Sequence, residues 1–283
     1  MDRRQRLIEI FEDTQRFYSQ NTQLSKAAQA AKAATKLYEE NDPLGELAAK
    51  GSEGQIVVSK HKTFEAAMQL HAEHPKWKIA VLNFASATNP GGGVKTGSSA
   101  QEESLCRCST LYPALTQDWL WQQYYQKNRD MHDNLHTDAC IYTPGVVICK
   151  TDAAYPERMD EKDWAYVDVI SCAAPNLRKK PGNLHNPEYG EAKTLNRDEL
   201  YQLHAKRAKH ILRVAASNEV DALVLGAFGC GAFANDPNTV AKAYADTLSE
   251  YRKYFQLVEF AVYCRPEETE NFDAFKRTLE RCD

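Results

Sequence analysis

Two adjacent glutamates, Glu102 and Glu103, follow the triple glycine at residues 91–93. Two carboxyl groups side by side raise the pKa of one of them, so that one glutamate can stay protonated near neutral pH and act as a general acid. An anion bound at the glycines would raise that pKa further. The alternative is structural, because acidic residues are favoured in the first turn of a helix, and a helix is predicted to begin near Ser99.

The spacing of this pair limits the chemistry. Neighbouring residues on a helix point about 100° apart. The two carboxyl groups therefore cannot readily flank one bond from opposite sides, as the carboxylates of most glycosidases do. A mechanism in which one glutamate first donates a proton and then accepts one fits this spacing better.

A second glycine-rich stretch, GAFGCGAF at residues 226–233, follows an apolar run of its own. Glycines let a backbone approach a ligand closely, and loops of this kind cradle phosphate groups. Neither stretch has the spacing of a Walker A or Rossmann motif. Either one alone is equally well explained as a tight turn between a strand and a helix. Together they predict a site that encloses a diphosphate from two sides.

Alternating strands and helices must position both stretches. Apolar runs predict strands at 55–60, 78–87, 139–150, 165–175, 221–229 and 257–264, and helical spacing predicts helices at 63–74, 194–217, 237–252 and 266–281. Almost wholly apolar strands are typical of buried parallel sheets. We therefore expect an α/β sandwich with a mixed, mostly parallel sheet covered on both faces. Ligands gather beyond the carboxyl ends of the strands in such folds, where both glycine stretches lie.

The first 50 residues differ from the rest of the chain. Residues 3–19 and 22–39 read as two helices rich in Ala, Leu, Glu and Lys, and a break follows them at 41–43. We expect an N-terminal helical accessory region at 1–50 and a catalytic domain at 51–283. The polar stretch 176–193 contains Pro and Gly, which predicts a mobile loop.

Composition excludes several classes of function. The chain has 283 residues, 43% of them hydrophobic, and a net charge of -4 from 35 basic and 39 acidic residues. This balance predicts no basic surface for a nucleic-acid backbone. The N-terminus lacks the apolar core of a signal peptide, and no run approaches the roughly 20 apolar residues of a membrane span. We expect a monomer in the cytoplasm that does not associate with membranes.

Cysteines, histidines and aromatic residues elsewhere in the chain are better explained by structural roles than by catalysis or ligand binding. No two of the eight cysteines form a CxxC pair, so a zinc site is not expected, and Cys106 and Cys108 are interpreted as buried free thiols. Three histidines in polar segments lack the spacing of metal ligands and are interpreted as surface or loop residues: His132, His136 and His185. Four aromatic residues could stack a base, but helix packing explains them better: Trp119, Trp121, Tyr124 and Tyr125.

The triple glycine, seven intervening residues and the sequence Gln-Glu-Glu at 101–103 together resemble the signature of the microbial type of poly(ADP-ribose) glycohydrolase, which is built on a macrodomain. The stretch LNFASATNPGGGVKTGSSAQEES resembles the first ligand loop of that family, IYTPGVVICK its following strand pair, and VLGAFGCGAFANDP its diphosphate loop. The resemblance covers roughly residues 50–280, and the N-terminal helices are similar to the accessory region of this type.

This resemblance implies a three-layer α/β/α macrodomain that binds ADP-ribose, without a cofactor or metal, and hydrolyses the ribose-ribose O-glycosidic bond at a chain terminus. Glu103 matches the catalytic acid, and Glu102 matches the neighbour that orients the scissile bond. The positions that match ligand-binding residues are Asn89, Gly91, Gly92, Gly93, Val94, Gln101, Phe228, Gly229, Cys230, Gly231, Ala232 and Phe233. For Phe228, a role in the core is an equally good interpretation.

The expected partner is a polymer of ADP-ribose or an ADP-ribosylated macromolecule. The long form of the family has extra regions without a counterpart in this chain, so cleavage inside a polymer is not expected. Two alternatives stay open. The chain could hydrolyse single ADP-ribose groups attached to protein or nucleic acid, or it could bind ADP-ribose without catalysis, with the glutamates serving only as helix caps.

Overall fold

The computed structural model describes residues 2–182 and 190–280 and contains one seven-stranded sheet with the order β1-β4-β5-β3-β6-β7-β2. Five neighbouring strands, β5, β3, β6, β7 and β2, are parallel to one another. Strand β4 pairs antiparallel with β5, and β1, at the edge of the sheet, pairs antiparallel with β4. The strands are β1 (Lys36–Tyr38), β2 (Gln55–Ser59), β3 (Ile79–Phe84), β4 (Cys140–Ile148), β5 (Ala165–Cys172), β6 (Ala222–Leu225) and β7 (Leu257–Ala261). The predicted mixed, mostly parallel sheet is confirmed.

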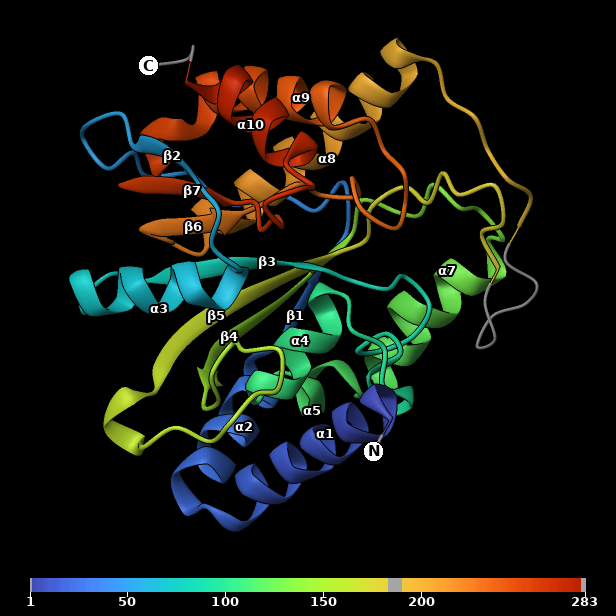
Figure 1. Cartoon of the computed structure of the whole chain (residues 1–283). Helices are drawn as coiled ribbons and strands as arrows, with labels where there is room; N and C mark the ends of the chain where they lie inside the picture. Colours follow the sequence, from blue (N-terminus) through green and yellow to red (C-terminus); the bar gives the residue numbers. More distant parts are fainter. Residues whose placement is uncertain (1, 183–189, 281–283) are drawn as a thin grey trace.

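Helices cover both faces of this sheet (Figure 1). One face carries α8 (Arg197–Ser217), α9 (Pro237–Tyr251) and α10 (Glu270–Leu279). The opposite face carries α1 (Arg3–Gln20), α2 (Thr22–Ala34), α3 (Thr63–Glu73), α4 (Gln101–Cys108) and α5 (Tyr112–Leu115). The short elements are η1 (Val94–Thr96), α6 (Asp118–Leu120), the π-helix η2 (Trp121–Gln126), α7 (Lys127–Asp130), η3 (Glu161–Asp163) and η4 (Arg252–Tyr254).

Strand β3 shows how the sheet separates two apolar cores. Successive side chains of a strand point to opposite faces. Ala80 and Leu82 accordingly join the cluster under α8, α9 and α10, whereas Ile79 and Val81 join the cluster on the face of α3 and α4. A strand buried on both sides needs apolar residues on both faces, which explains why residues 79–82 read as an unbroken apolar run.

The N-terminal prediction was wrong at residues 36–39, which were predicted to end the second helix. Helix α2 ends at Ala34, and Lys36, Leu37 and Tyr38 pair with β4 as the edge strand β1. Pairing with an existing sheet edge overrides the helix propensity of a short segment. Residues 1–50 thus supply one strand of the main sheet as well as helices, and the division at residue 50 stays a prediction.

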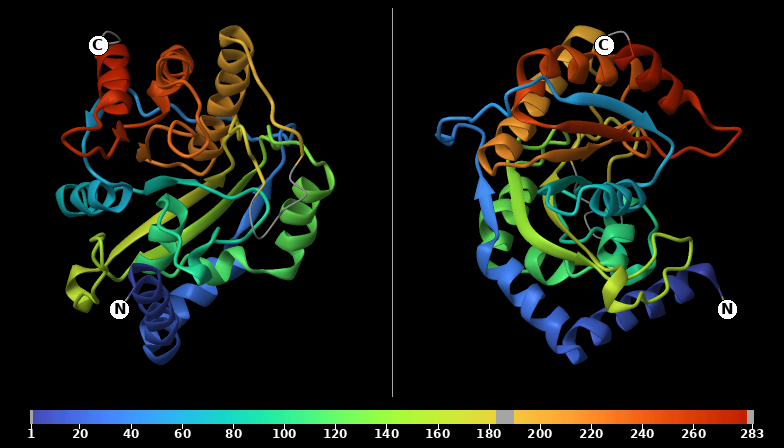
Figure 2. Two further views of the ribbon diagram at one scale, coloured as in Figure 1. Left: turned by 45° about the vertical axis from the view of Figure 1, so that its right-hand side comes forward. Right: turned by 90° about the vertical axis from the view of Figure 1, so that its left-hand side faces the viewer.

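Helix α1 is bonded to helix α4 and to the end of β4. The hydroxyl of Thr14 donates to the carbonyl of Arg107 at 2.6 Å, and Arg107 Nε donates back to the carbonyl of Leu7 at 3.2 Å. The buried Lys150 ammonium lies 2.8 Å from Asp13 and donates to the carbonyl of Ile10 at 3.0 Å. Figure 2 shows α1 and α2 on the side of the sheet opposite α8, α9 and α10. The N-terminal helices therefore hold the helix that carries the glutamate pair.

The remaining predictions agree with the structure in kind and differ mainly at element ends. Cys106 and Cys108 are buried free thiols, as predicted, and Tyr124 and Tyr125 pack in the core. His136 lies in a loop, as predicted, although its side chain is buried there. His185 and part of the predicted loop 176–193 lie outside the described residues. Across the described ranges, no helix is long and apolar enough to cross a membrane.

Candidate active site

A cavity of about 710 Å³ opens at the carboxyl edge of the parallel strands. Its size is typical of a site for a small ligand. Every parallel strand contributes a lining residue at or after its carboxyl end, namely Thr63 after β2, Phe84 on β3, Ala174 after β5, Ala227 after β6 and Val262 after β7. Helix α4 also lines the cavity through Gln101 and Ser104. The two glycine loops follow β3 and β6, which are neighbours in the sheet (Figure 1).

The second glycine loop presents free backbone donors to this cavity. Four of its residues line the cavity, and in the described part of the chain no hydrogen bond engages their N–H groups: Gly229, Gly231, Ala232 and Phe233. Gly229 has a φ of +78°, and a Cβ there would lie 2.8 Å from Asn235 Nδ2. Only glycine adopts this conformation without strain. Unpaired N–H groups gathered in one loop form a nest for an anion.

The first glycine loop encloses the glutamates instead. Its N–H groups bond within the loop or to the pair: that of Gly92 donates to the carbonyl of Asn89 at 2.9 Å, and that of Gly93 to Glu103 Oε1 at 2.8 Å. Gly92 has a φ of +59°, and a Cβ on this residue would lie 2.5 Å from Glu103 Oε1. The glycine at this position is therefore required by the carboxyl group beneath it.

Glu102 is held by groups that follow and belong to β3. The backbone N–H of Ser86 donates to Glu102 Oε2 at 2.8 Å, and the Asn83 amide donates to Oε1 at 3.4 Å. Burial, followed by the charge of Glu103, raises the pKa of Glu102 to about 8. Hydrogen bonds from the protein lower this pKa but do not outweigh these two effects. Glu102 therefore holds a proton at neutral pH, as the sequence predicted for one of the two glutamates.

Glu103 is buried with one carboxyl oxygen unused. Oε1 accepts from the Gly93 N–H, whereas Oε2 has no hydrogen-bond partner among the described residues. A buried carboxyl oxygen without a partner is costly, so such atoms are rare outside functional sites. The cap of α4, Ala100, forms no side-chain cap bond, and the two carboxyl groups bond to residues of the preceding loop. Their contacts are not those of simple helix caps.

Gln101 fastens the start of α4 to the end of β3. Its Oε1 accepts from the N–H of Phe84 at 2.8 Å, and its Nε2 donates to the carbonyl of Leu82 at 2.7 Å and to the hydroxyl of Thr63 at 3.0 Å. The amide thus extends the hydrogen bonding of the strand beyond the sheet. This contact fixes the distance between the strand end and the glutamates that follow Gln101.

Asn89 is bonded to α7 and is not among the residues that line the cavity. Arg129 donates to Asn89 Oδ1 and, at 2.9 Å, to the carbonyl of Thr88. The guanidinium also lies 5.0 Å from the ring of Trp121, at the start of the π-helix. Sequence reasoning missed Arg129 and Ser86, because neither belongs to a motif and Arg129 is 40 residues from its partner. Val94 is buried in the core, and a ligand contact for Asn89, Val94 or the glycines of the first loop stays a prediction.

The two phenylalanines of the second loop occupy different environments. Phe228 is fully buried and packs 5.5 Å from the ring of Phe84, in the core cluster under α8 and α9. Phe233 lines the cavity, with the guanidinium of Arg178 5.6 Å from its ring. Cys230 lies between them, and burial raises the pKa of its thiol. Of the two rings, that of Phe233 is the one placed to contact a ligand.

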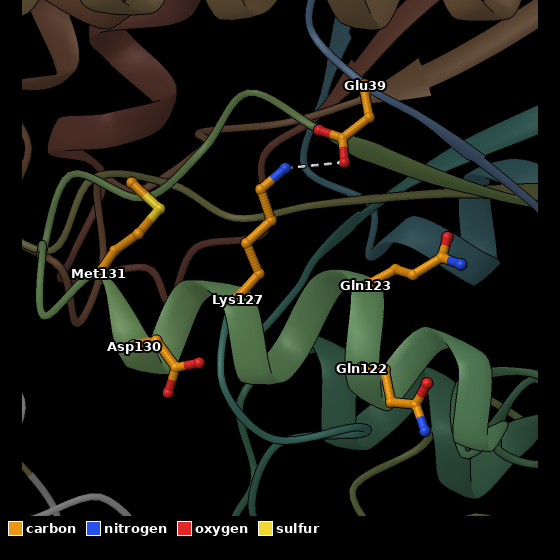
Figure 3. A pocket seen from close by; sticks show the side chains of 6 residues that line it. All are labelled: Glu39, Gln122, Gln123, Lys127, Asp130 and Met131. Carbon is orange, nitrogen blue, oxygen red and sulfur yellow. Dashed lines mark hydrogen bonds and ion pairs between the residues drawn. The ribbon is translucent and has the colours of Figure 1, made fainter.

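A second hollow, of about 600 Å³, lies beside η2 and α7 (Figure 3). Five of its six lining residues are polar or charged, and the full set is Glu39, Gln122, Gln123, Lys127, Asp130 and Met131. An ion pair of 2.8 Å between Lys127 and Glu39 crosses it and ties the segment after β1 to α7. The hollow is therefore a junction between the N-terminal region and the helix that holds Asn89.

The fold and the cavity define a macrodomain-like α/β protein. A family model described as "Microbial-type PARG, catalytic domain" matches residues 5–151. Among solved structures, the poly(ADP-ribose) glycohydrolase of Thermomonospora curvata is similar at 29% identity with a TM-score of 0.80, covering 96% of this chain and 98% of that one. Its complex with the inhibitor ADP-HPD is similar at 30% identity with a TM-score of 0.78, and the match covers 96% of this chain and 98% of that one.

The poly(ADP-ribose) glycohydrolase of Deinococcus radiodurans in complex with ADP-ribose is similar at 34% identity with a TM-score of 0.71. This match covers 90% of this chain and 97% of that one. No curated protein matches this sequence. The chain belongs to the microbial-type poly(ADP-ribose) glycohydrolase family, whose members are glycohydrolases that act on poly(ADP-ribose).

Proposed function

We propose that this protein hydrolyses the ribose-ribose O-glycosidic bonds of poly(ADP-ribose), mainly at chain termini, and releases ADP-ribose. The observation that carries the proposal is the unpartnered Oε2 of Glu103, buried under the first glycine loop on a helix that also lines the cavity. The free N–H groups of the second loop support the binding half of the proposal, because the diphosphate of ADP-ribose needs such donors.

In the proposed mechanism, Glu103 protonates the oxygen of the departing ribose and then accepts a proton from the attacking water. Burial and the charge of Glu103 raise the pKa of Glu102, so a proton is held beside Glu103 at neutral pH and can pass through Glu103 to the ribose oxygen. The bound diphosphate raises the proton affinity of the pair further. Glu102, held by Ser86 and Asn83, orients the ribose at the scissile bond. The protonated pair can thus serve one glycosidic oxygen without a second carboxyl group on the opposite side.

In the proposed complex, the diphosphate lies on the loop at residues 229–233 and the distal ribose extends toward the first glycine loop. Phe233 contacts the ligand, while Phe228 supports the loop from the core. The glycines at 91–93, with Asn89 and Val94, shape the wall between ribose and glutamates. We also propose that the protein acts as a monomer in the cytoplasm and that residues 1–50 form an accessory region.

Incubation with end-labelled poly(ADP-ribose) tests this function. We expect free ADP-ribose to appear from the first time point, with chains that shorten gradually. Intermediate oligomers formed before free ADP-ribose would contradict cleavage at termini. A mono-ADP-ribosylated protein, tested in parallel, should be a poor substrate; release from that protein alone would favour the hydrolase of single ADP-ribose groups, and tight binding without release from either would favour the binding module.

Gly92→Ala should lower kcat about 100-fold, because the new methyl group would displace Glu103 Oε1 and a misplaced catalytic group costs about this much. The positive φ adds roughly 1 kcal/mol of strain. The measurement is ADP-ribose release at saturating polymer. Gly45→Ala is the matched control, because a Cβ there meets nothing within 4 Å. A Gly92→Ala enzyme with the kcat of the wild type would show that the glycine does not shape the catalytic site.

A further inference from the structure

The side chain of Asn235 holds the second glycine loop from behind. Its Nδ2 group donates to the carbonyl oxygens of Pro175, Gly229 and Phe233 at 2.8, 3.0 and 3.2 Å. Its backbone N–H donates to the Gly229 carbonyl as well, at 3.1 Å. Only 2% of Asn235 is exposed, so solvent does not compete for these bonds. One buried amide therefore holds both ends of the loop at residues 229–233 and ties them to the segment after β5.

These three donations fix the orientation of the amide and of its next neighbour. Because the nitrogen end must donate to the carbonyls, Oδ1 faces Nε2 of His204 at 2.8 Å. Nε2 must then carry the proton. His204 is fully buried on α8, and burial lowers its pKa to about 4, so the ring is neutral at physiological pH. A continuous chain of hydrogen bonds thus runs from α8 through His204 and Asn235 to the loop.

The free donors of the cavity lie within the stretch that this chain holds. The loop residues with unengaged N–H groups run from Gly229 to Phe233, the two residues whose carbonyls Asn235 binds. Asn235 and His204 are not among the residues that line the cavity. They can therefore act on a ligand only through the conformation of the loop. Hydrogen bonds to a charged group are strong, so the affinity for a diphosphate depends on the direction in which these N–H groups point.

We propose that Asn235 and His204 are a positioning pair, which holds the loop at residues 229–233 so that its N–H groups converge on the diphosphate of ADP-ribose. The inference rests on the proposed function, because it takes ADP-ribose as the ligand of the cavity. It adds two residues that do not touch the ligand but determine its affinity.

Calorimetric titration of the full-length protein with ADP-ribose tests the pair. We expect Asn235→Ala to raise Kd at least tenfold. Asn235→Asp should raise Kd more, because a carboxylate cannot donate to the three carbonyls and adds a negative charge behind the loop. The control is Asn218→Ala at the C-cap of α8, whose amide also makes several bonds, to Val214 and Tyr38, and none to the loop at residues 229–233. It should lower the melting temperature and leave Kd unchanged.

Kinetics and a second pair of variants separate positioning from general stability. Because the glutamates are held by the first loop, Asn235→Ala should raise KM for the polymer far more than it lowers kcat. His204→Gln keeps a donor for Asn235 Oδ1 and should keep a Kd within about threefold of the wild type, whereas His204→Leu should raise Kd about tenfold. This comparison decides the question even if Asn235→Ala folds poorly.

The possible failures are distinguishable. If the wild type does not bind ADP-ribose, the proposed function fails. If the wild type binds ADP-ribose and His204→Leu, or a folded Asn235 variant, binds it equally tightly with only a lower melting temperature, the pair is merely structural and the inference is overturned.

Discussion

Glu103→Gln is expected to lower kcat for the release of ADP-ribose from poly(ADP-ribose) by about 10³-fold, which is the usual contribution of a general acid. Glutamine keeps the size of the side chain, and its oxygen can still accept from the Gly93 N–H that now binds Oε1. It cannot supply a proton to the departing ribose or take one from water. The measurement is steady-state release of ADP-ribose, quantified by chromatography, at saturating polymer.

Two controls show whether this loss is chemical. The variant should bind ADP-ribose with a Kd near that of the wild type, because the second loop carries the diphosphate donors. Glu250→Gln, at an exposed position on α9, should leave kcat unchanged. Equal activity of Glu103→Gln and the wild type would remove Glu103 from the mechanism, and a loss of both binding and folding would show that its role is structural.

Glu102→Gln is expected to stabilise the protein at alkaline pH. The pKa of Glu102 is about 8 in the folded protein against an ordinary value of 4.5, so folding disfavours its charged form. The free energy of unfolding is not reduced by this effect below pH 4.5. The reduction grows as the pH rises to 8 and is complete above it, where it amounts to roughly 5 kcal/mol. Glutamine carries no charge to bury. Urea unfolding at pH 4.5, 7 and 9 measures the difference.

We expect the free energy of unfolding of Glu102→Gln to exceed that of the wild type by several kcal/mol at pH 9, by less at pH 7, and by little or nothing at pH 4.5. Glutamine has one acceptor oxygen and cannot keep the contacts with both Ser86 and Asn83, and this loss lowers the gain in the free energy of unfolding by about 1 kcal/mol at every pH. Glu250→Gln should show no such pH dependence. If the free energies of unfolding of Glu102→Gln and the wild type differ by the same amount at all three pH values, Glu102 is not protonated in the folded protein.

Much of the fold can be predicted from the sequence because buried parallel strands and amphipathic helices leave strong patterns. Strand β3 is apolar at every position except Asn83, and α8 begins with a capping box formed by Asn196 and Glu199. The edge strand β1 is different. Its three residues follow a helix without a glycine or proline to end it, and only pairing with β4 makes it a strand. Such tertiary pairing leaves no local pattern in the sequence.

The site could be predicted only in part, for the same physical reason. The glycines and the glutamate pair are close in sequence, so their spacing indicates their contact. The amide of Asn235 meets His204 from 31 residues away, and Arg129 meets Asn89 from 40. Neither of these two separations in sequence follows the period of a helix or a strand, so neither contact leaves a pattern in the sequence. The hydrogen bond from the Gly93 N–H to Glu103 could not be predicted either, because glycines indicate that a backbone can approach a group closely but not which group it meets.

In the proposed mechanism, Glu103 transfers the proton while Glu102 positions the ribose. The most direct test is single-turnover hydrolysis, with enzyme in excess over the labelled chain ends, for the wild type, Glu103→Gln and Glu102→Gln. We predict complete release of terminal ADP-ribose by the wild type and a rate about 10³-fold lower for Glu103→Gln, although this variant still binds the chain end. Release by Glu103→Gln at the rate of the wild type would contradict the account.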